Sequence, residues 1–313
     1  MRKKFGTILA WTVTIGILVY LFRAIPLAKV GEAINAAYWW AIPATALIVV
    51  AVYLADSYAI KKTFGWFVAP LSYREVLVVR GATYLLALVN YTIGQGAIIY
   101  FVNRSRGVPL LRGTAAVLLI MGVNVLMLLV LASLGLLVAV DVPPELRLVV
   151  LTAYAALAVY VSLVALRPGW LARRPIFDVL LSAGVSGHLR AMAVRVPHIL
   201  SLLALSWVSL AAFGVVIPVA KAILCLPIVY FVAVLPISVQ GLGTSQALLI
   251  HFFSDYAPGA TTEARWAAVL AAGLVAQAVA FVIQLSIGLG CMRSQLARGL
   301  APPTEATAME KTS

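Results

Sequence analysis

Glycines and neutral polar residues interrupt two apolar stretches of this chain, and these two breaks could bind an anion. The first stretch, 75–102, contains Gly96, and the second, 222–253, contains Gly241 and Gly243. Glycine permits tight turns and leaves backbone N–H groups free at the start of a returning helix, where anions bind. The neutral polar residues around the breaks are Asn90, Gln95, Ser238, Gln240, Thr244, Ser245 and Gln246. We therefore expect the two breaks together to contact an anionic group.

An arginine lies inside the first apolar stretch and has two interpretations. Arg80 is near the beginning of this stretch, and an arginine at the centre of a hydrocarbon layer costs about 2.5–3.5 kcal/mol. It could be a fixed cation for a phosphate headgroup, supported by Arg104 and Arg106 where the stretch ends. It could instead extend its side chain to a nearby interface. Asp56, in an earlier apolar run, could pair with Arg80 or lie without consequence near the end of its helix.

The composition is that of a membrane protein. Hydrophobic residues make up 64% of the 313 residues and charged residues 11%, with a mean hydropathy of +1.06. A soluble domain carries about 25% charged residues. Six runs are long enough to cross about 30 Å of hydrocarbon as helices, and they are 5–22, 39–60, 113–140, 148–166, 199–220 and 266–292. The two broken stretches are longer than one crossing and too short for two. We therefore predict an all-α polytopic bundle with six full spans and two re-entrant helical hairpins.

The distribution of Lys and Arg predicts the orientation. With both broken stretches entering and leaving on the same side, one face of the membrane collects most of the 23 Lys and Arg residues. By the positive-inside rule this face is cytoplasmic, and both termini lie on it. The two hairpins then enter from opposite faces with three spans between them. This arrangement predicts an inverted-topology repeat with a central site.

The remaining segments carry weaker signals. The basic stretch 167–198 is predicted as the longest loop, which either lies on anionic lipids as an amphipathic segment or only marks the cytoplasmic side. Residues 5–22 resemble an uncleaved signal anchor, and 300–313 are predicted as a disordered cytoplasmic tail. Cys225 and Cys291 follow no metal-ligand spacing, so we interpret them as small buried hydrophobes.

The second break resembles the signature of a known family. Residues 235–246 read LPISVQGLGTSQ, which is similar to the pattern L-P-I-S-x-x-G-L-G-x-x-E of the flippase-like family related to the membrane region of lysylphosphatidylglycerol synthase. Asn90, Gly94 and the arginines before Gly107 resemble its earlier block. Gln246 stands where the family has an acidic residue, and this removes a charge that could couple transport to protons or cations. The resemblance implies movement of a phospholipid or a lipid-linked sugar between leaflets.

Two classes of function remain after the motifs are considered. No catalytic motif of a protease, hydrolase or nucleotide-binding protein is present in the sequence. We expect no lysyltransferase activity, because that activity requires a soluble aminoacyl-transferase domain in addition to the membrane region, and we expect no cofactor or metal site. We expect a non-enzymatic lipid translocator, flippase or scramblase, in a cell inner membrane or plasma membrane. The alternative is a membrane enzyme or an accessory subunit that presents a lipid to a lipid- or glycan-modifying partner. Nucleic acid is not an expected partner, because the net charge of +13 reflects orientation in the membrane.

Overall fold

All regular secondary structure in the described part of the chain is helical. The computed structural model describes residues 2–89, 91–138, 144–234, 238 and 241–299, and none of them forms a β-strand. The helices are α1 (Arg2–Ala24), α2 (Leu27–Asn35), α3 (Ala41–Phe67), α4 (Tyr73–Val89), α5 (Tyr91–Arg106), α6 (Leu110–Val138), α7 (Pro144–Leu166), α8 (Gly169–Ala172), η1 (Pro175–Phe177), α9 (Asp178–Ala211), α10 (Val219–Val234), α11 (Thr244–Phe253), η3 (Ser254–Tyr256) and α12 (Thr262–Gly299). A helix satisfies its own backbone hydrogen bonds, which is the requirement for a segment surrounded by lipid.

Several helices are long and apolar enough to cross a membrane. By length and composition these are the segments Ala41–Phe67, Leu110–Leu137, Pro175–Ala211 and Thr262–Arg293, and the bent pair α1 and α2 is a fifth candidate. The all-α class and the multi-pass membrane character predicted from composition are therefore supported. The apolar part of α7, Leu151–Leu166, is shorter than a full crossing among the described residues.

The predicted loop 167–198 and the predicted span 199–220 are wrong. Helix α9 begins at Asp178 and continues to Ala211, so only 167–177 connects it to α7, and 212–218 is not helical. The arginines and histidines of 178–198 suggested a solvated loop, but several of them face the protein interior. His188, for example, is buried and lies 2.6 Å from the Tyr160 hydroxyl of α7.

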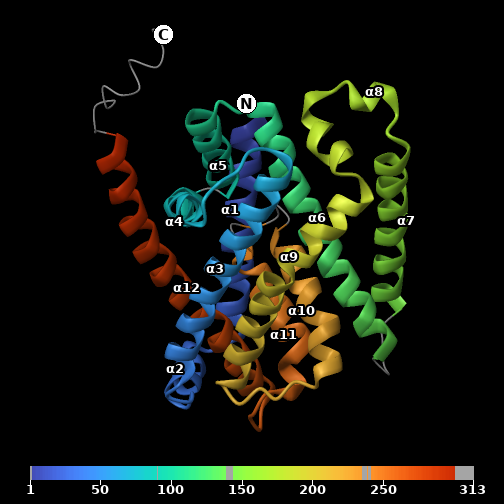
Figure 1. Cartoon of the computed structure of the whole chain (residues 1–313). Coiled ribbons are helices and arrows are strands. Elements are labelled where there is room, and N and C mark those ends of the chain that lie inside the picture. Colours follow the sequence, from blue (N-terminus) through green and yellow to red (C-terminus); the bar gives the residue numbers. More distant parts are fainter. Residues whose placement is uncertain (1, 90, 139–143, 235–237, 239–240, 300–313) are drawn as a thin grey trace, which may run out of the picture.

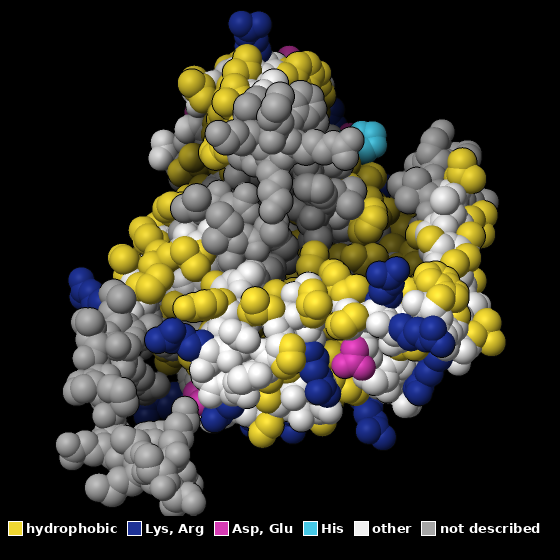
Figure 2. Space-filling model, turned by 90° about the horizontal axis from the view of Figure 1, so that it is seen from above, with side chains coloured by type: hydrophobic (Ala, Val, Ile, Leu, Met, Phe, Trp, Pro, Cys, Tyr) yellow, Lys and Arg dark blue, Asp and Glu magenta, His cyan; other side chains and the backbone are white. Residues whose placement is uncertain are grey.

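The first residue of α1 and the last residue of α12, which we call the described termini, lie at the same end of the bundle (Figure 1). This end also carries α8, the α3–α4 connection and the α5–α6 connection, whereas α2 and the α9–α10 and α11–α12 connections lie at the other end. Figure 2 looks onto the end with the termini, where many Lys and Arg side chains and few acidic ones are visible among the described residues. Two ion pairs lie at this end of the bundle. Arg106 of α5 pairs with Glu75 of α4 at 2.7 Å, and Arg112 of α6 pairs with Asp178 of α9 at 3.7 Å.

The two broken stretches form helical hairpins at opposite ends of the bundle (Figure 1). In the first, α4 packs against α5, and in the second, α10 packs against α11. Each first helix also packs on a long helix from the other half of the chain, α4 on α12 and α10 on α6, while α3 packs on α9 between them. Gly288 of α12 allows close contact with α4, because a Cβ there would lie 2.6 Å from Leu85 Cγ.

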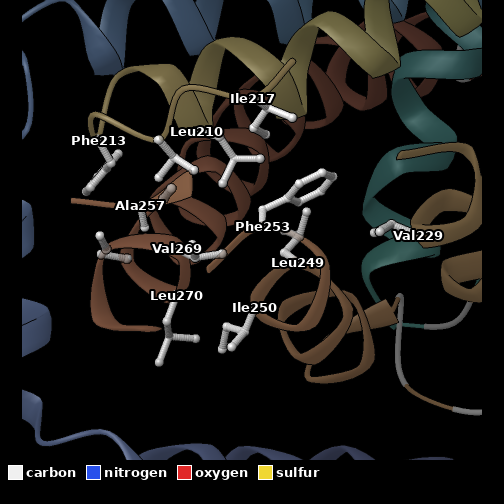
Figure 3. Close-up of a cluster of buried hydrophobic side chains, with 14 of the residues drawn as sticks. Leu210, Phe213, Ile217, Val229, Leu249, Ile250, Phe253, Ala257, Val269 and Leu270 are labelled. Carbon is white, nitrogen blue, oxygen red and sulfur yellow. The ribbon is translucent and has the colours of Figure 1, made fainter. Parts of the chain in front are cut away.

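Two apolar clusters form the core. One joins α3, α4, α5, α6 and α9, with Phe64, Leu119 and Val179 fully buried. The other joins α1, α2, α10, α11, α12 and the end of α9, and Figure 3 shows Phe253 of α11 among Leu210, Val269 and their neighbours. Cys225 is fully buried in this second cluster, as predicted. Cys291 is only partly buried, on α12 where it faces Gly81.

Candidate functional site

A cluster of charged side chains is buried between four helices. Asp56 of α3 lies at its centre with 3% of its side chain exposed. Arg80 of α4 donates from Nε to Asp56 Oδ2 at 2.6 Å, and Arg195 of α9 donates from Nη2 to Oδ1 at 2.7 Å. Arg195 also donates from Nε to the side-chain oxygen of Asn124 on α6. His198 of α9 completes the group, with Nε2 4.0 Å from Asp56 Oδ1. We call these five residues the Asp56 cluster.

The Asp56 cluster lies at the middle of the long helices. Asp56 is 15 residues after the first residue of α3 and 11 before the last, which is about 22 Å and 16 Å at a rise of 1.5 Å per residue. Asn124 is 14 residues from either end of α6, and Arg195 is 11 residues after the kink of α9 at Gly184 and 16 before the last residue of the helix. In a bilayer with about 30 Å of hydrocarbon, these positions are near the midplane. Ionisable groups at this depth are rare and mark functional sites by default.

The cluster contains more positive than negative charge. The four candidate spans hold three acidic residues, and two of these, Asp178 and Glu263, are in the first turns of their helices. Asp56 is therefore the one carboxylate at mid-depth in these spans, and it faces two guanidinium groups. Apart from the imidazole, the formal charge is +1. Buried charges are normally paired, and here one carboxylate is shared by the two guanidinium groups.

Arg80 connects the cluster to the outside of the bundle. Its side chain is 14% exposed, against 2% for Arg195, and its guanidinium carbon lies 5.2 Å from the centre of the Tyr84 ring. Arg80 also borders a small apolar hollow between α3, α4 and α5, which is lined by Ile60, Leu71, Val76, Val79, Ile98, Phe101 and Val102. The hollow has room for about one water molecule, so it marks an apolar surface beside the arginine rather than a preformed ligand pocket.

The sequence predicted part of this cluster. The possible pairing of Asp56 with Arg80 is confirmed, and Arg80 turns to Asp56 inside the bundle. Asn124 of α6 accepts an interhelical hydrogen bond from Arg195. Arg195 and His198 were missed, because they fall in the segment that was predicted as a loop. The signal was their spacing, since the buried residues Gly187, His188, Ala191, Arg195 and His198 recur every three or four positions on one helical face.

The other predicted residues of the first hairpin are not part of the Asp56 cluster. Arg106 pairs with Glu75 where the two ends of the hairpin meet, and Arg104 is exposed at the same end of α5. Gly96 is exposed in α5, with open space around the position of a Cβ. Asn90 and the side chain of Gln95 lie outside the described residues.

The polar residues of the second break satisfy one another. Ser238 Oγ lies 2.8 Å from Thr244 Oγ1, which donates to the carbonyl of Gly241 at 3.0 Å. The side-chain oxygen of Gln246 accepts from the backbone N–H of Gly243 at 2.7 Å, which closes the start of α11. Ser238 and Gln246 are buried, and Gln240 lies outside the described residues. The structure thus brings these residues together as a closed turn rather than as part of the Asp56 cluster.

Helix α1 covers this turn. Gly241 and Gly243 have φ values of +74° and +83°, which glycine adopts at no steric cost. A Cβ on Gly243 would lie 3.2 Å from Ile17 Cβ and 3.4 Å from the carbonyl oxygen of Thr14, both of α1. The glycines are therefore required by the shape of the turn and by the close contact with α1.

Comparisons with models of protein families, with curated proteins and with solved structures found no match to this chain.

Proposed function

We propose that this protein moves an anionic lipid, either a phospholipid or a lipid-linked sugar, between the leaflets of its membrane. The observation that carries this proposal is the position of Arg80, which belongs to a buried ionic cluster at the middle of the long helices and is more exposed than either Asp56 or Arg195. A phosphodiester carries one negative charge and would bind its guanidinium group.

In this proposal Arg80 exchanges partners during transport. Arg80 is the most exposed of the three charged residues, and its Nε bond to Asp56 is the contact nearest the hollow. A lipid phosphate accepts hydrogen bonds from the guanidinium, for which arginine is well shaped. Asp56 keeps its second partner, Arg195, throughout. The carboxylate thereby remains balanced whether the lipid is bound or absent.

Two helical hairpins at opposite ends of the bundle support alternating access to one site. We propose that α4–α5 and α10–α11 are re-entrant hairpins of an inverted repeat, as in transporters with broken helices. The crossed packing of α4 on α12 and α10 on α6, with α3 on α9 between them, is the pattern expected for such a repeat. The proposed topology has six full spans and both termini in the cytoplasm, on the basic end of Figure 2. The resemblance of 235–246 to the flippase-like signature points to the same function.

Purified protein in liposomes tests the proposal directly. The liposomes contain a trace of fluorescent phosphatidylglycerol, which is a monoanionic phosphodiester, or of fluorescent phosphatidylcholine, which is zwitterionic. A membrane-impermeant reductant then removes the fluorescence of the outer leaflet. We expect the protein to make the inner-leaflet phosphatidylglycerol accessible several-fold faster than in empty liposomes, with a smaller effect on phosphatidylcholine. Binding of phosphatidylglycerol without movement would contradict translocation and favour the alternative in which the protein presents a lipid to an enzyme.

A further inference from the structure

Helix α2 lies across the direction of the bundle at the end opposite the termini. It follows α1 after Pro26, and the two helices are bent by 82° relative to one another. Figure 1 shows α2 at the lower end, beside the start of α3. A helix nearly perpendicular to a spanning helix lies close to the plane of the membrane surface.

The surface of α2 is divided into three sectors. At 100° per residue, Val30 and Ala33 share one side, and both pack on the core cluster of α12 and its neighbours. Leu27 and Ile34 share the next side, and they are 66% and 44% exposed. The third side carries Lys29 and Glu32, exposed and paired at 3.0 Å, together with Asn35. One side of α2 thus contacts protein, the second is apolar and uncovered, and the third is polar.

Aromatic residues continue the apolar sector after α2. Trp39 is 87% exposed, and Tyr38, 56% exposed, stacks on Trp40 with 5.7 Å between ring centres. The uncovered apolar surface extends along the chain to exposed Tyr20 on α1 and exposed Ile42 on α3. Tryptophan and tyrosine are enriched at the boundary between headgroups and hydrocarbon.

The spacing of the exposed tryptophans along α3 agrees with the thickness of a bilayer. Trp39 is two residues before the first residue of α3, and Trp66, 44% exposed, is at its far end. The 27 residues of α3 extend about 40 Å at 1.5 Å per residue, which is the thickness of a bilayer with its interfacial regions. Trp39 and its neighbours on α2 are therefore at the depth of one interface.

We propose that α2 and residues 38–40 form an interfacial anchor, whose partner is the lipid leaflet at the end opposite the termini. The Leu27 and Ile34 side rests on the acyl chains, and the Lys29 and Glu32 side faces water. Because α1 leads directly into α2 and covers the turn at Gly243, the anchor also fixes α1 over the second hairpin. This proposal does not depend on lipid translocation.

Spin labels on single cysteines test the anchor in liposomes. Cys225 and Cys291 are first replaced by Ala, and a nitroxide is then attached at position 27, 34, 29 or 32. Collisions with oxygen, which concentrates in lipid, are compared with collisions with a water-soluble nickel complex. Labels at 47, an exposed leucine within α3, and at 255, an aspartate with 88% of its side chain exposed, provide the lipid and water references.

The two sides of α2 should respond in opposite ways. We expect a several-fold higher ratio of oxygen to nickel collisions at 27 and 34 than at 29 and 32. Equal access of nickel to all four positions would overturn the proposal, because α2 would then lie clear of the membrane. High oxygen access at all four would also overturn it, because α2 would then lie inside the hydrocarbon.

Discussion

The two helical hairpins occupy corresponding positions at opposite ends of the bundle, but their side chains make different kinds of contact. In the first, α4 carries Arg80 into the Asp56 cluster, and its Tyr84 ring lies 5.7 Å from that of Tyr53 on α3. In the second, α10 buries Leu224, Cys225 and Leu226 in an apolar cluster. Among the described residues, Tyr230 of α10 makes polar contacts with α9, since its hydroxyl donates to the carbonyl of Leu202 at 2.5 Å and lies 2.8 Å from Ser206 Oγ.

The two hairpins therefore share a backbone arrangement, but only the first contributes a charged residue to the Asp56 cluster. In the proposed function, the two hairpins give a lipid access to one site from the two ends of the bundle. The charge that would recognise a substrate belongs to one half of the chain and to α9, which contributes Arg195 and His198. We therefore expect substitutions in the first hairpin to alter recognition of the lipid, and substitutions in the second to alter stability and the opening of the site.

The largest expected effect is from loss of the central carboxylate. Asp56→Asn leaves Arg80 and Arg195 without their counter-charge inside the bundle, which should lower the free energy of unfolding by about 3–5 kcal/mol. Chemical denaturation in detergent micelles measures this change. Asp255→Asn is the matched control, because Asp255 is 88% exposed and 3.7 Å from Arg265. The control should change stability by less than about 1 kcal/mol. Equal effects of the two substitutions would mean that the cluster is not a balanced ionic centre.

A smaller loss is expected from removal of the amide that accepts from Arg195. Asn124→Ala deletes the side-chain oxygen to which Arg195 Nε donates, and an unsatisfied buried donor costs about 1–3 kcal/mol. A double-mutant cycle with Arg195→Leu measures the coupling of the two residues in the same denaturation experiment. We expect non-additive losses, since the residues are in contact. Additive losses would contradict the hydrogen bond.

The two hairpins should differ in their response to replacement of glycine by alanine. Gly241 has a φ of +74°, and a Cβ there would lie 2.8 Å from Ala233 Cβ, so Gly241→Ala should cost about 1–2 kcal/mol from the backbone conformation alone. Gly96 lies within α5 with open space around it, so Gly96→Ala should stabilise the helix by about 0.5–1 kcal/mol. Denaturation of the two variants side by side measures both values. A loss at Gly96 as large as that at Gly241 would show that the first hairpin is as tightly constrained as the second.

The smallest effect is expected at the open end of the first hairpin. The Glu75–Arg106 pair joins the start of α4 to the end of α5, with 27% and 39% of the two side chains exposed. Glu75→Gln should lower stability by about 0.2–1 kcal/mol, and high salt should reduce the difference from the unmodified protein, because exposed pairs are screened. A difference independent of salt would indicate that the hydrogen bonds of Glu75 with Ser72 are the larger contribution.

The sequence predicted the parts of this fold that depend on hydropathy. The all-α class, the two broken stretches and the gathering of basic loops at one end follow from long apolar runs and from the positions of Lys and Arg. The course of α9 did not follow, because Arg195 and His198 reduce the apolar character of a helix whose charges are compensated by Asp56 of α3. This compensation comes from a residue 139 positions away, and no local pattern records it.

Part of the candidate site also followed from the sequence. Arg80 and Asp56 were recognised as charges within apolar runs, and their pairing was foreseen as one possibility. The breaks were expected to offer free donors, but at the second break Gln246 accepts from Gly243 and Ser238 contacts Thr244. Polar side chains close to a glycine turn can satisfy the turn itself, and the sequence alone does not distinguish this role from ligand binding.

The central claim is that Arg80 binds the lipid phosphate, and the rate of phosphatidylglycerol movement in liposomes tests it most directly. Arg80→Ala should reduce this rate to that of empty liposomes, and Arg80→Lys should retain part of it, because a lysine keeps the charge and loses the paired donors. Arg265→Ala, at the opposite end of the bundle from the termini, is the control and should transport at the unmodified rate. Movement by Arg80→Ala at the unmodified rate, in protein that remains folded, would contradict the claim and leave the Asp56 cluster with a structural role.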